Sequence, residues 1–259
     1  MTIFKVGVSE LPPDLAAPSG EWSKVSACVA REAPYLFLLN EMPFGGWISS
    51  LDTFDERVWT ESCSAHANGV MRLADLGTPF VAGSRPTESN NLRTNEAFIW
   101  SSDRVLQSVH TKQYFPEEEG YYEARWFQPG ERHFRVAAAG ALRCGFLICT
   151  ELMFNEHARQ YGRAGAHVIL VPRAVGSMAL DRWLVAMQMA AIVSGCYVLS
   201  SNRSGVDARG QMFGGLGWII DPFGEVIAQT SAAHPVVFQE MDTDVVAKAQ
   251  REYPCYVKE

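Results

Sequence analysis

The stretch CGFLICTELMFNEHARQYGRAGAHVILVP, residues 144–172, decides the fold class. It begins with a continuous apolar run, CGFLIC, which is typical of a strand that is buried on both faces. The segment NEHARQYGRAG has helical spacing and ends at a glycine, as helices commonly do. A second apolar run, HVILVP, follows it. A strand, a helix and a strand in this order predict a layered α/β architecture.

The same kinds of segment continue outward from this stretch. Strands are expected at residues 3–9, 35–40, 79–84, 96–100, 104–112, 141–149, 166–172, 196–202, 217–222, 225–231 and 235–242. Helices are expected at residues 21–32, 54–77, 155–165 and 180–195. An aromatic and acidic loop is expected at residues 113–130. No linker, charge block or low-complexity run divides the 259 residues, so a single domain over 1–259 is predicted.

Bulk composition excludes several classes of partner. The formal net charge of -7 argues against a nucleic-acid surface, which needs a basic stripe. The sequence has neither a run of 18 apolar residues nor a signal-peptide pattern at its start, so we expect no membrane partner and a cytoplasmic location. The six cysteines lack CxxC spacing and the six histidines lack an HExxH motif. We therefore expect free thiols, no metal and no cofactor.

Three residues of reactive type follow predicted strands. Glu41 and Lys112 stand at the ends of two apolar strands, and Cys149 closes a third. The carboxyl ends of parallel strands gather at one edge of a sheet, so these side chains can meet there. A thiol is mostly protonated near neutral pH; a carboxylate can remove its proton, and an ammonium can stabilise the thiolate and a later oxyanion. The three residues together predict a cysteine nucleophile.

Each residue alone also has an ordinary explanation. A glutamate after a strand is usually a solvated loop residue, and a lysine is usually on the surface. A buried cysteine often serves as a small apolar residue in the core. His157 offers a Cys–His pair instead, although a histidine on a helix is more often a surface or core residue.

Four groups of segments together resemble the nitrilase superfamily, the carbon–nitrogen hydrolases, over nearly the whole chain. LLNEMPFGGW resembles the strand that ends in the family's catalytic glutamate, which is Glu41 here. HTKQYFP resembles the segment that contains the family's catalytic lysine, which is Lys112 here. The opening stretch resembles the nucleophile segment, with Cys149 at the cysteine. The segments NRSG, FGG and IIDPFGEVIA resemble the later strands and turns of the family. The resemblance implies a four-layer α-β-β-α sandwich, a Glu-Lys-Cys triad, no metal and a homodimer or higher homo-oligomer.

The resemblance also suggests residues that contact the substrate. Many members have a second glutamate before a Pro-Gly turn, which is Glu123 here, although Glu117, Glu118 and Glu119 lie nearby in the same loop. The backbone N–H of Thr150 is expected to stabilise an oxyanion. Four further side chains are candidates for an apolar pocket, and aromatic residues at such positions are as often core: Trp126, Phe127, Phe154 and Met178. Arg173 could hold an acid group or be a surface arginine.

The expected function is hydrolysis of a small amide or N-carbamoyl compound through a cysteine thioester. The segment after Cys149 departs from nitrilases, with Thr150-Glu151 in place of their usual Trp-Glu, which favours an amide over a nitrile. A nitrilase, and an acyltransferase that uses the same thioester, remain alternatives. A scaffold with a vestigial site is disfavoured because all three reactive residue types are present.

Overall fold

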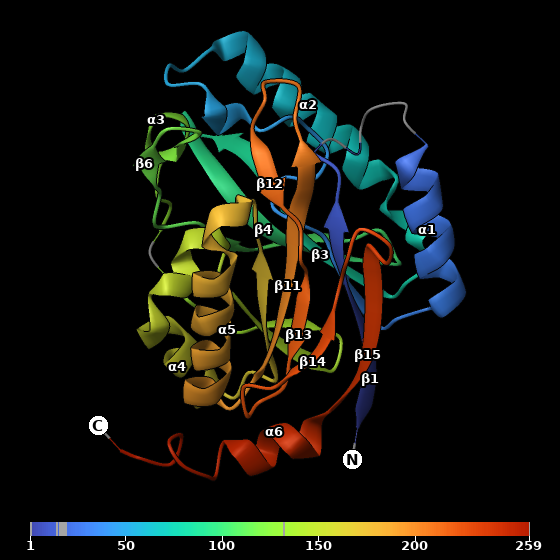
Figure 1. Cartoon of the computed structure of the whole chain (residues 1–259), viewed down its shortest axis with the longest axis vertical. Helices are drawn as coiled ribbons and strands as arrows, with labels where there is room; N and C mark the ends of the chain where they lie inside the picture. Colours follow the sequence, from blue (N-terminus) through green and yellow to red (C-terminus); the bar gives the residue numbers. More distant parts are fainter. Residues whose placement is uncertain (1, 14, 16–19, 132, 259) are drawn as a thin grey trace.

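Two mixed β-sheets face each other and carry helices on their outer sides, which gives a four-layer α-β-β-α sandwich (Figure 1). The computed structural model describes residues 2–13, 15, 20–131 and 133–258. The strands form one hydrogen-bonded order, β5-β4-β3-β2-β1-β11-β10-β9-β8. Only Glu10↔Asn202 and Leu11↔Arg203 pair β1 with β11, so this junction joins two sheets. The four-layer sandwich predicted from the sequence is confirmed.

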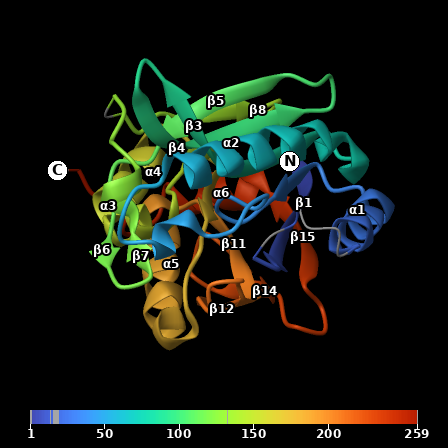
Figure 2. The same ribbon diagram turned by 90° about the horizontal axis from the view of Figure 1, so that it is seen from above.

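The first sheet contains the N-terminal strands. Its strands are β1 (Ile3–Leu11), β2 (Leu36–Leu38), β3 (Phe80–Ser89), β4 (Leu92–Ser101), β5 (Leu106–Thr111) and, beside β1, β15 (Val236–Asp242). The helices α1 (Glu21–Glu32) and α2 (Glu56–Met71) cover it. α1 and α2 lie on the other side of the molecule from α4 (Asn155–Arg163) and α5 (Leu180–Ser194) in Figure 1, and the turned view in Figure 2 also separates α1 from α5.

The second sheet contains the strands of the later sequence. They are β8 (Ala137–Ala139), β9 (Leu142–Phe146), β10 (Val168–Pro172), β11 (Tyr197–Val206), β12 (Met212–Gly214), β13 (Trp218–Ile220) and β14 (Val226–Gln229). β9, β10 and β11 are parallel, so their carboxyl ends lie at one edge. The helices α4 and α5 belong to this half, and α6 (Thr243–Ala249) follows β15.

The continuous apolar run of β2 follows from its position between two hydrophobic layers. Leu36 and Leu38 belong to the core between the sheets, whereas Phe37 and Leu39 pack against the helices of the first sheet. Because successive side chains of a strand point to opposite faces, a strand covered on both sides needs apolar residues at every position. None of the helices in the described part of the chain is long and apolar enough to cross a membrane.

Most predicted elements are present, with several differences. β9 ends at Phe146, so Cys149 does not close the strand as expected; it begins the 3-10 helix η3 (Cys149–Met153). The strands expected at 79–84 and 96–100 are longer than predicted, because β3 and β4 extend into a long hairpin whose turn is Asn90 and Asn91, both with positive φ. The expected loop at 113–130 contains β6 (Glu117–Glu118), β7 (Tyr121–Tyr122) and the short helix α3 (Glu123–Trp126). The helix α6 and the short strands β8 and β12 were not predicted.

Candidate active site

Two carboxylates and one ammonium meet at the edge where β2 and β5 end. Lys112 follows β5 directly, and its Nζ lies 2.8 Å from Glu41 Oε1 and 2.5 Å from Glu123 Oε2. All three side chains are completely buried. Buried charges of this kind are stable only when they are paired and hydrogen-bonded, as here. The sequence-predicted Glu41, Lys112 and Glu123 are therefore brought together, although they come from three different elements.

Cys149 lies at the same place, on the wall of a pocket. Its φ of 50° lies in the left-handed region, which non-glycine residues rarely adopt and which often marks a functional position. Its side chain is 4% exposed. Among the described residues, Glu41 Oε2 and Glu123 Oε1 are buried without a hydrogen-bond partner. Each carboxylate thus retains one oxygen for a proton or for a ligand.

The balance of charge determines the protonation of the cluster. Burial, reinforced by the carboxylate of Glu41, raises the pKa of the Cys149 thiol well above its ordinary value. Burial works against the ammonium of Lys112, but Glu123 and Glu41 outweigh it and raise that pKa. Burial also raises the pKa of Glu123 to about 8, although Lys112 opposes the shift. The resting cysteine is therefore a thiol, and a nearby base must remove its proton.

A buried carboxylate that sequence reasoning did not identify holds the cysteine segment in place. Glu151 accepts a hydrogen bond from the backbone N–H of Ile148 at 2.8 Å and from that of Gln113 at 2.7 Å. Its Oε2 also lies 2.8 Å from His110 Nε2. Glu151 therefore ties the residue before Cys149 to the residue after Lys112. The available sequence signal was an acidic residue two positions after the predicted nucleophile.

Two further residues that the sequence analysis missed hold Glu41. Asn95 Nδ2 donates to Glu41 Oε1 at 2.8 Å, and the backbone carbonyl of Asn95 accepts from the Lys112 N–H at 2.9 Å. The buried guanidinium of Arg203 donates to the carbonyls of Glu41 at 3.1 Å and Gly45 at 3.0 Å, and also to that of Met42. Met42 has a φ of 47°, so Arg203 fixes an unusual turn directly after Glu41.

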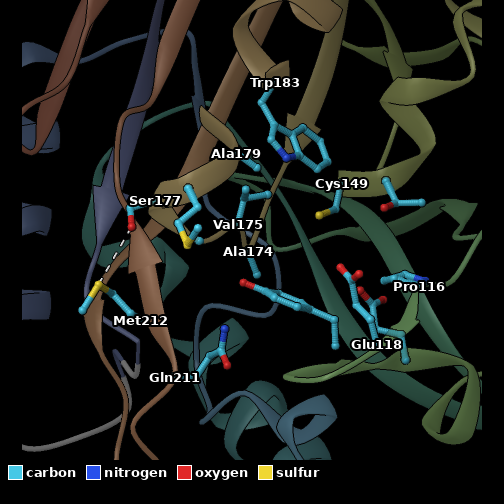
Figure 3. Close-up of a pocket in the computed structure, with 15 residues that line it drawn as sticks. Pro116, Glu118, Cys149, Ala174, Val175, Ser177, Ala179, Trp183, Gln211 and Met212 are labelled. Atoms are coloured by element: carbon cyan, nitrogen blue, oxygen red, sulfur yellow. Dashed lines mark hydrogen bonds between the residues drawn. The ribbon is translucent and has the colours of Figure 1, made fainter. Parts of the chain in front are cut away.

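A pocket of about 370 Å³ opens above this cluster, a size within the usual range for small-molecule sites. Its lining comes from the β6–β7 hairpin, η3, the segment after β10, the start of α5 and the segment before β12 (Figure 3). The residues are Pro116, Glu118, Tyr121, Glu123, Cys149, Thr150, Ala174, Val175, Gly176, Ser177, Met178, Ala179, Trp183, Gln211 and Met212. Of the predicted pocket residues, Thr150 and Met178 lie in this lining.

The other predicted contact residues lie elsewhere. Trp126 and Phe127 are buried in a separate hydrophobic cluster because α3 turns them toward Phe54 and Trp59. Phe154 is 37% exposed and stacks on Tyr114 with ring centroids 4.1 Å apart.

Arg173 and His157 are also in the interior rather than on the pocket wall. Arg173 is fully buried, donates to Ser200 Oγ at 2.6 Å and covers the Trp218 ring, so it is not a surface arginine. His157 stacks on Phe134, which places it in the core. Across the residues that the structure describes, no group of three or more His, Cys, Asp or Glu side chains could hold a metal ion.

Comparisons with known proteins agree with the fold. The sequence model of the carbon-nitrogen hydrolases matches residues 5–251. N-carbamoylputrescine amidase from Solanum lycopersicum is 27% identical over 184 residues, 65% of this chain and 61% of that protein. Citrullinase from Francisella tularensis is 30% identical over 145 residues, 52% of this chain and 51% of that protein. The chain thus spans about three fifths of the first relative and about half of the second.

Solved structures share the architecture along almost the entire chain. The carbon-nitrogen hydrolase from Helicobacter pylori superposes with a TM-score of 0.86 at 18% identity, over 98% of this chain and 94% of that one. An amidase from Nesterenkonia sp. superposes with a TM-score of 0.75 at 19% identity, over 94% and 92% of the two chains. Identity this low shows a common fold, whereas the sequence match over residues 5–251 shows common descent. The chain therefore belongs to the carbon–nitrogen hydrolase family.

Proposed function

We propose that this protein hydrolyses the C–N bond of a small amide or N-carbamoyl compound through a thioester on Cys149. The observation that carries the proposal is the convergence of Glu41, Lys112 and Glu123 beneath the pocket that Cys149 lines. The names of relatives, such as N-carbamoylputrescine amidase and 2-oxoglutaramate amidase, support the same reaction class.

In the first half of the reaction Glu41 acts as the base. Its unpaired Oε2 takes the thiol proton, and the sulfur of Cys149 attacks the carbonyl carbon of the substrate. An ammonium has three N–H groups, and two of those on Lys112 donate hydrogen bonds to Glu41 and Glu123. The third is available for the developing oxyanion, together with the backbone N–H of Thr150.

In the second half the thioester is hydrolysed. Glu41 gives its proton to the departing amine or ammonia, the C–N bond breaks, and the acyl group remains on the sulfur of Cys149. Water then enters, and Glu41 takes one of its protons as the water oxygen attacks the thioester carbon. The C–S bond breaks, the acid is released, and the proton passes from Glu41 to the sulfur, which restores the thiol. No electrons are exchanged with any other reagent, so this scheme requires no cofactor.

The geometry of Glu123 favours an amide over a nitrile. Its unpaired Oε1 is buried beside the nucleophile and, when Glu123 is ionised, can accept a hydrogen bond from the N–H of an amide. A nitrile has no N–H, so this buried oxygen would remain without a partner, which is unfavourable. Glu123 is therefore proposed as the residue that positions the reacting amide.

A panel of small amides, ureido compounds and nitriles tests the proposed function. We expect ammonia or amine release from an amide or ureido compound, loss of release in Cys149→Ala, and a transient acyl mass on the wild type by intact-protein mass spectrometry. Cys28→Ala is the matched control, since Cys28 lies on α1 and outside the pocket lining. Turnover by Cys149→Ala at the wild-type rate would remove Cys149 from the mechanism.

We also infer that the protein forms a homodimer through the outer face of η3 and α5. Large apolar side chains are exposed on these two adjacent elements, including Met153 (43%), Val185 (63%) and Met189 (45%), and such faces are typical of protein interfaces. Light scattering should show a dimer that Val185→Asp dissociates. Met71→Asp, at an exposed position on α2, should leave the mass unchanged.

All six cysteines are free thiols, which supports the proposal of a cytoplasmic location, because disulfides are uncommon in that compartment. Fractionation of cells that produce the protein would test this location directly.

A further inference from the structure

Among the described residues, none of those on the walls of the active-site pocket is a lysine or arginine. Its ionisable side chains are the acids Glu118 and Glu123, the phenol Tyr121 and Cys149 itself, and the rest of the lining is mostly apolar. Figure 3 shows Cys149 between Trp183 on one side and Glu118 on the other. A ligand that fills this pocket therefore meets apolar groups along its length and an acid at the mouth.

The β6–β7 hairpin sets the orientation of Glu118. Glu118 is paired with Tyr121 across the hairpin, so both side chains lie on the same face, and both line the pocket. Its neighbour Glu117 points to the opposite face, where its Oε1 is 2.6 Å from Arg125 Nε. No ion pair of Glu118 occurs among the residues that the structure describes. Glu117 is thus paired with Arg125, whereas Glu118 faces the pocket without an ion pair in the described part of the chain.

Two buried cations close to the pocket do not compensate this charge. Lys112 lies below the floor and is shared between two carboxylates. Arg173 lies behind the wall, fully buried, with its guanidinium over the Trp218 ring. Neither side chain reaches the pocket surface.

We infer that the substrate is an amide or carbamoyl compound whose apolar chain ends in an ammonium group, and that compounds ending in a carboxylate are rejected. This inference rests on the proposed function. A carboxylate in the pocket would lose its hydration without gaining a cation, which is strongly unfavourable. It would also be repelled by Glu118, whereas an ammonium at the mouth would be attracted by it.

Three straight-chain amides of equal length, ending in an ammonium, a methyl or a carboxylate group, test the inference. With the wild type, kcat/KM for the carboxylate should lie at least about a hundredfold below that for the methyl compound. The ammonium compound should exceed the methyl compound by about two- to fivefold, since Glu118 is exposed and its attraction is screened.

Substitutions at Glu118 should change these ratios. Glu118→Gln should abolish the ammonium preference, and Glu118→Lys should reverse it and improve the carboxylate compound relative to the methyl compound. Glu119→Gln is the matched control, because Glu119 is an exposed acid of the same hairpin that does not line the pocket. Its ratios should equal those of the wild type.

A binding measurement separates this inference from the proposed function. Cys149→Ala protein should bind the three amides in the same order in calorimetric titrations, and this order does not depend on turnover. If the wild type hydrolyses none of the amides but the order of binding holds, the hydrolase proposal fails and the inferred ligand preference stands. A preference for the carboxylate, unchanged ratios in both Glu118 variants, or no binding of any of the three amides would overturn the inference.

Discussion

Replacement of Glu151 by glutamine should slow the enzyme strongly although Glu151 is not a group that is proposed to react. The Glu151 carboxylate accepts hydrogen bonds from the backbone N–H groups of Ile148 and Gln113, and from His110 Nε2. In Glu151→Gln one oxygen becomes an NH₂ group, so at least one of these donors would face another donor. The side chain keeps its size, and any effect therefore comes from hydrogen bonding and charge.

The magnitude follows from the number and kind of these hydrogen bonds. A hydrogen bond to a charged group contributes about 1.5–3 kcal/mol, and leaving a buried donor unpaired costs about 1–3 kcal/mol more. Glu151→Gln should therefore lower the free energy of unfolding by about 3–5 kcal/mol. A shift of Cys149 by roughly 1 Å is enough to reduce the rate about a hundredfold. We expect kcat to fall by about 10- to 100-fold, with a smaller change in KM.

Urea denaturation and steady-state kinetics on the best amide measure the two effects separately. Glu156→Gln is the matched control, since Glu156 is exposed on α4 and close in sequence. It should resemble the wild type in both measurements. If Glu151→Gln were as stable as Glu156→Gln and equally active, then Glu151 would not position the nucleophile segment, and our account of that segment would be wrong.

Three other outcomes follow from the site. Glu41→Gln should slow alkylation of Cys149 by iodoacetamide at neutral pH about a hundredfold or more, measured by peptide mass spectrometry; an unchanged rate would exclude Glu41 as its base. Arg203→Lys should lower kcat about tenfold with little change in KM, because an ammonium cannot span the carbonyls that a guanidinium reaches; normal kinetics would remove Arg203 from the support of Glu41. The Glu123 pKa rises from an ordinary 4.5 to about 8 on folding, so its contribution to stability is complete below pH 4.5 and is lost as the pH rises through 8. Between pH 5 and pH 9 the wild type should therefore lose on the order of 4 kcal/mol of unfolding free energy relative to Glu123→Gln, and an unchanged difference in unfolding free energy between the two proteins across this range would contradict the raised pKa.

The parts of the fold that depend on local pattern could be predicted from the sequence. Apolar runs and helical spacing indicated the strands and helices of both sheets, because a strand covered on both faces leaves a strong signal. The meeting of Glu41 and Lys112 also followed, since Lys112 directly follows β5 and Glu41 lies shortly after β2, and the ends of these strands share an edge. Cys149 was placed correctly near that edge, but the end of β9 was predicted three residues too late.

The pocket lining could not be predicted because it depends on which face of each helix turns toward the pocket. Residues that are close in sequence do not determine this. Trp126 and Phe127 face the core because α3 packs against Phe54 and Trp59, which are more than sixty residues earlier. Trp183 lies on α5, which is apolar around most of its circumference, so its periodicity does not indicate which face borders a cavity. The buried guanidinium of Arg173 donates to Ser200 Oγ and lies over the Trp218 ring, and both of these residues are distant in sequence.

The central position of β1 has a consequence for how the protein is made. β1 begins at the third residue of the chain. In the finished sheet it pairs with both β2 and β15, and its last residues join β11. Its antiparallel partner, Val236–Asp242, leaves the ribosome more than two hundred residues later. Contacts of such long separation form slowly, and strand edges that wait for a partner are prone to aggregate. Synthesis of this chain is therefore expected to depend on chaperones until β15 emerges and closes the edge of β1.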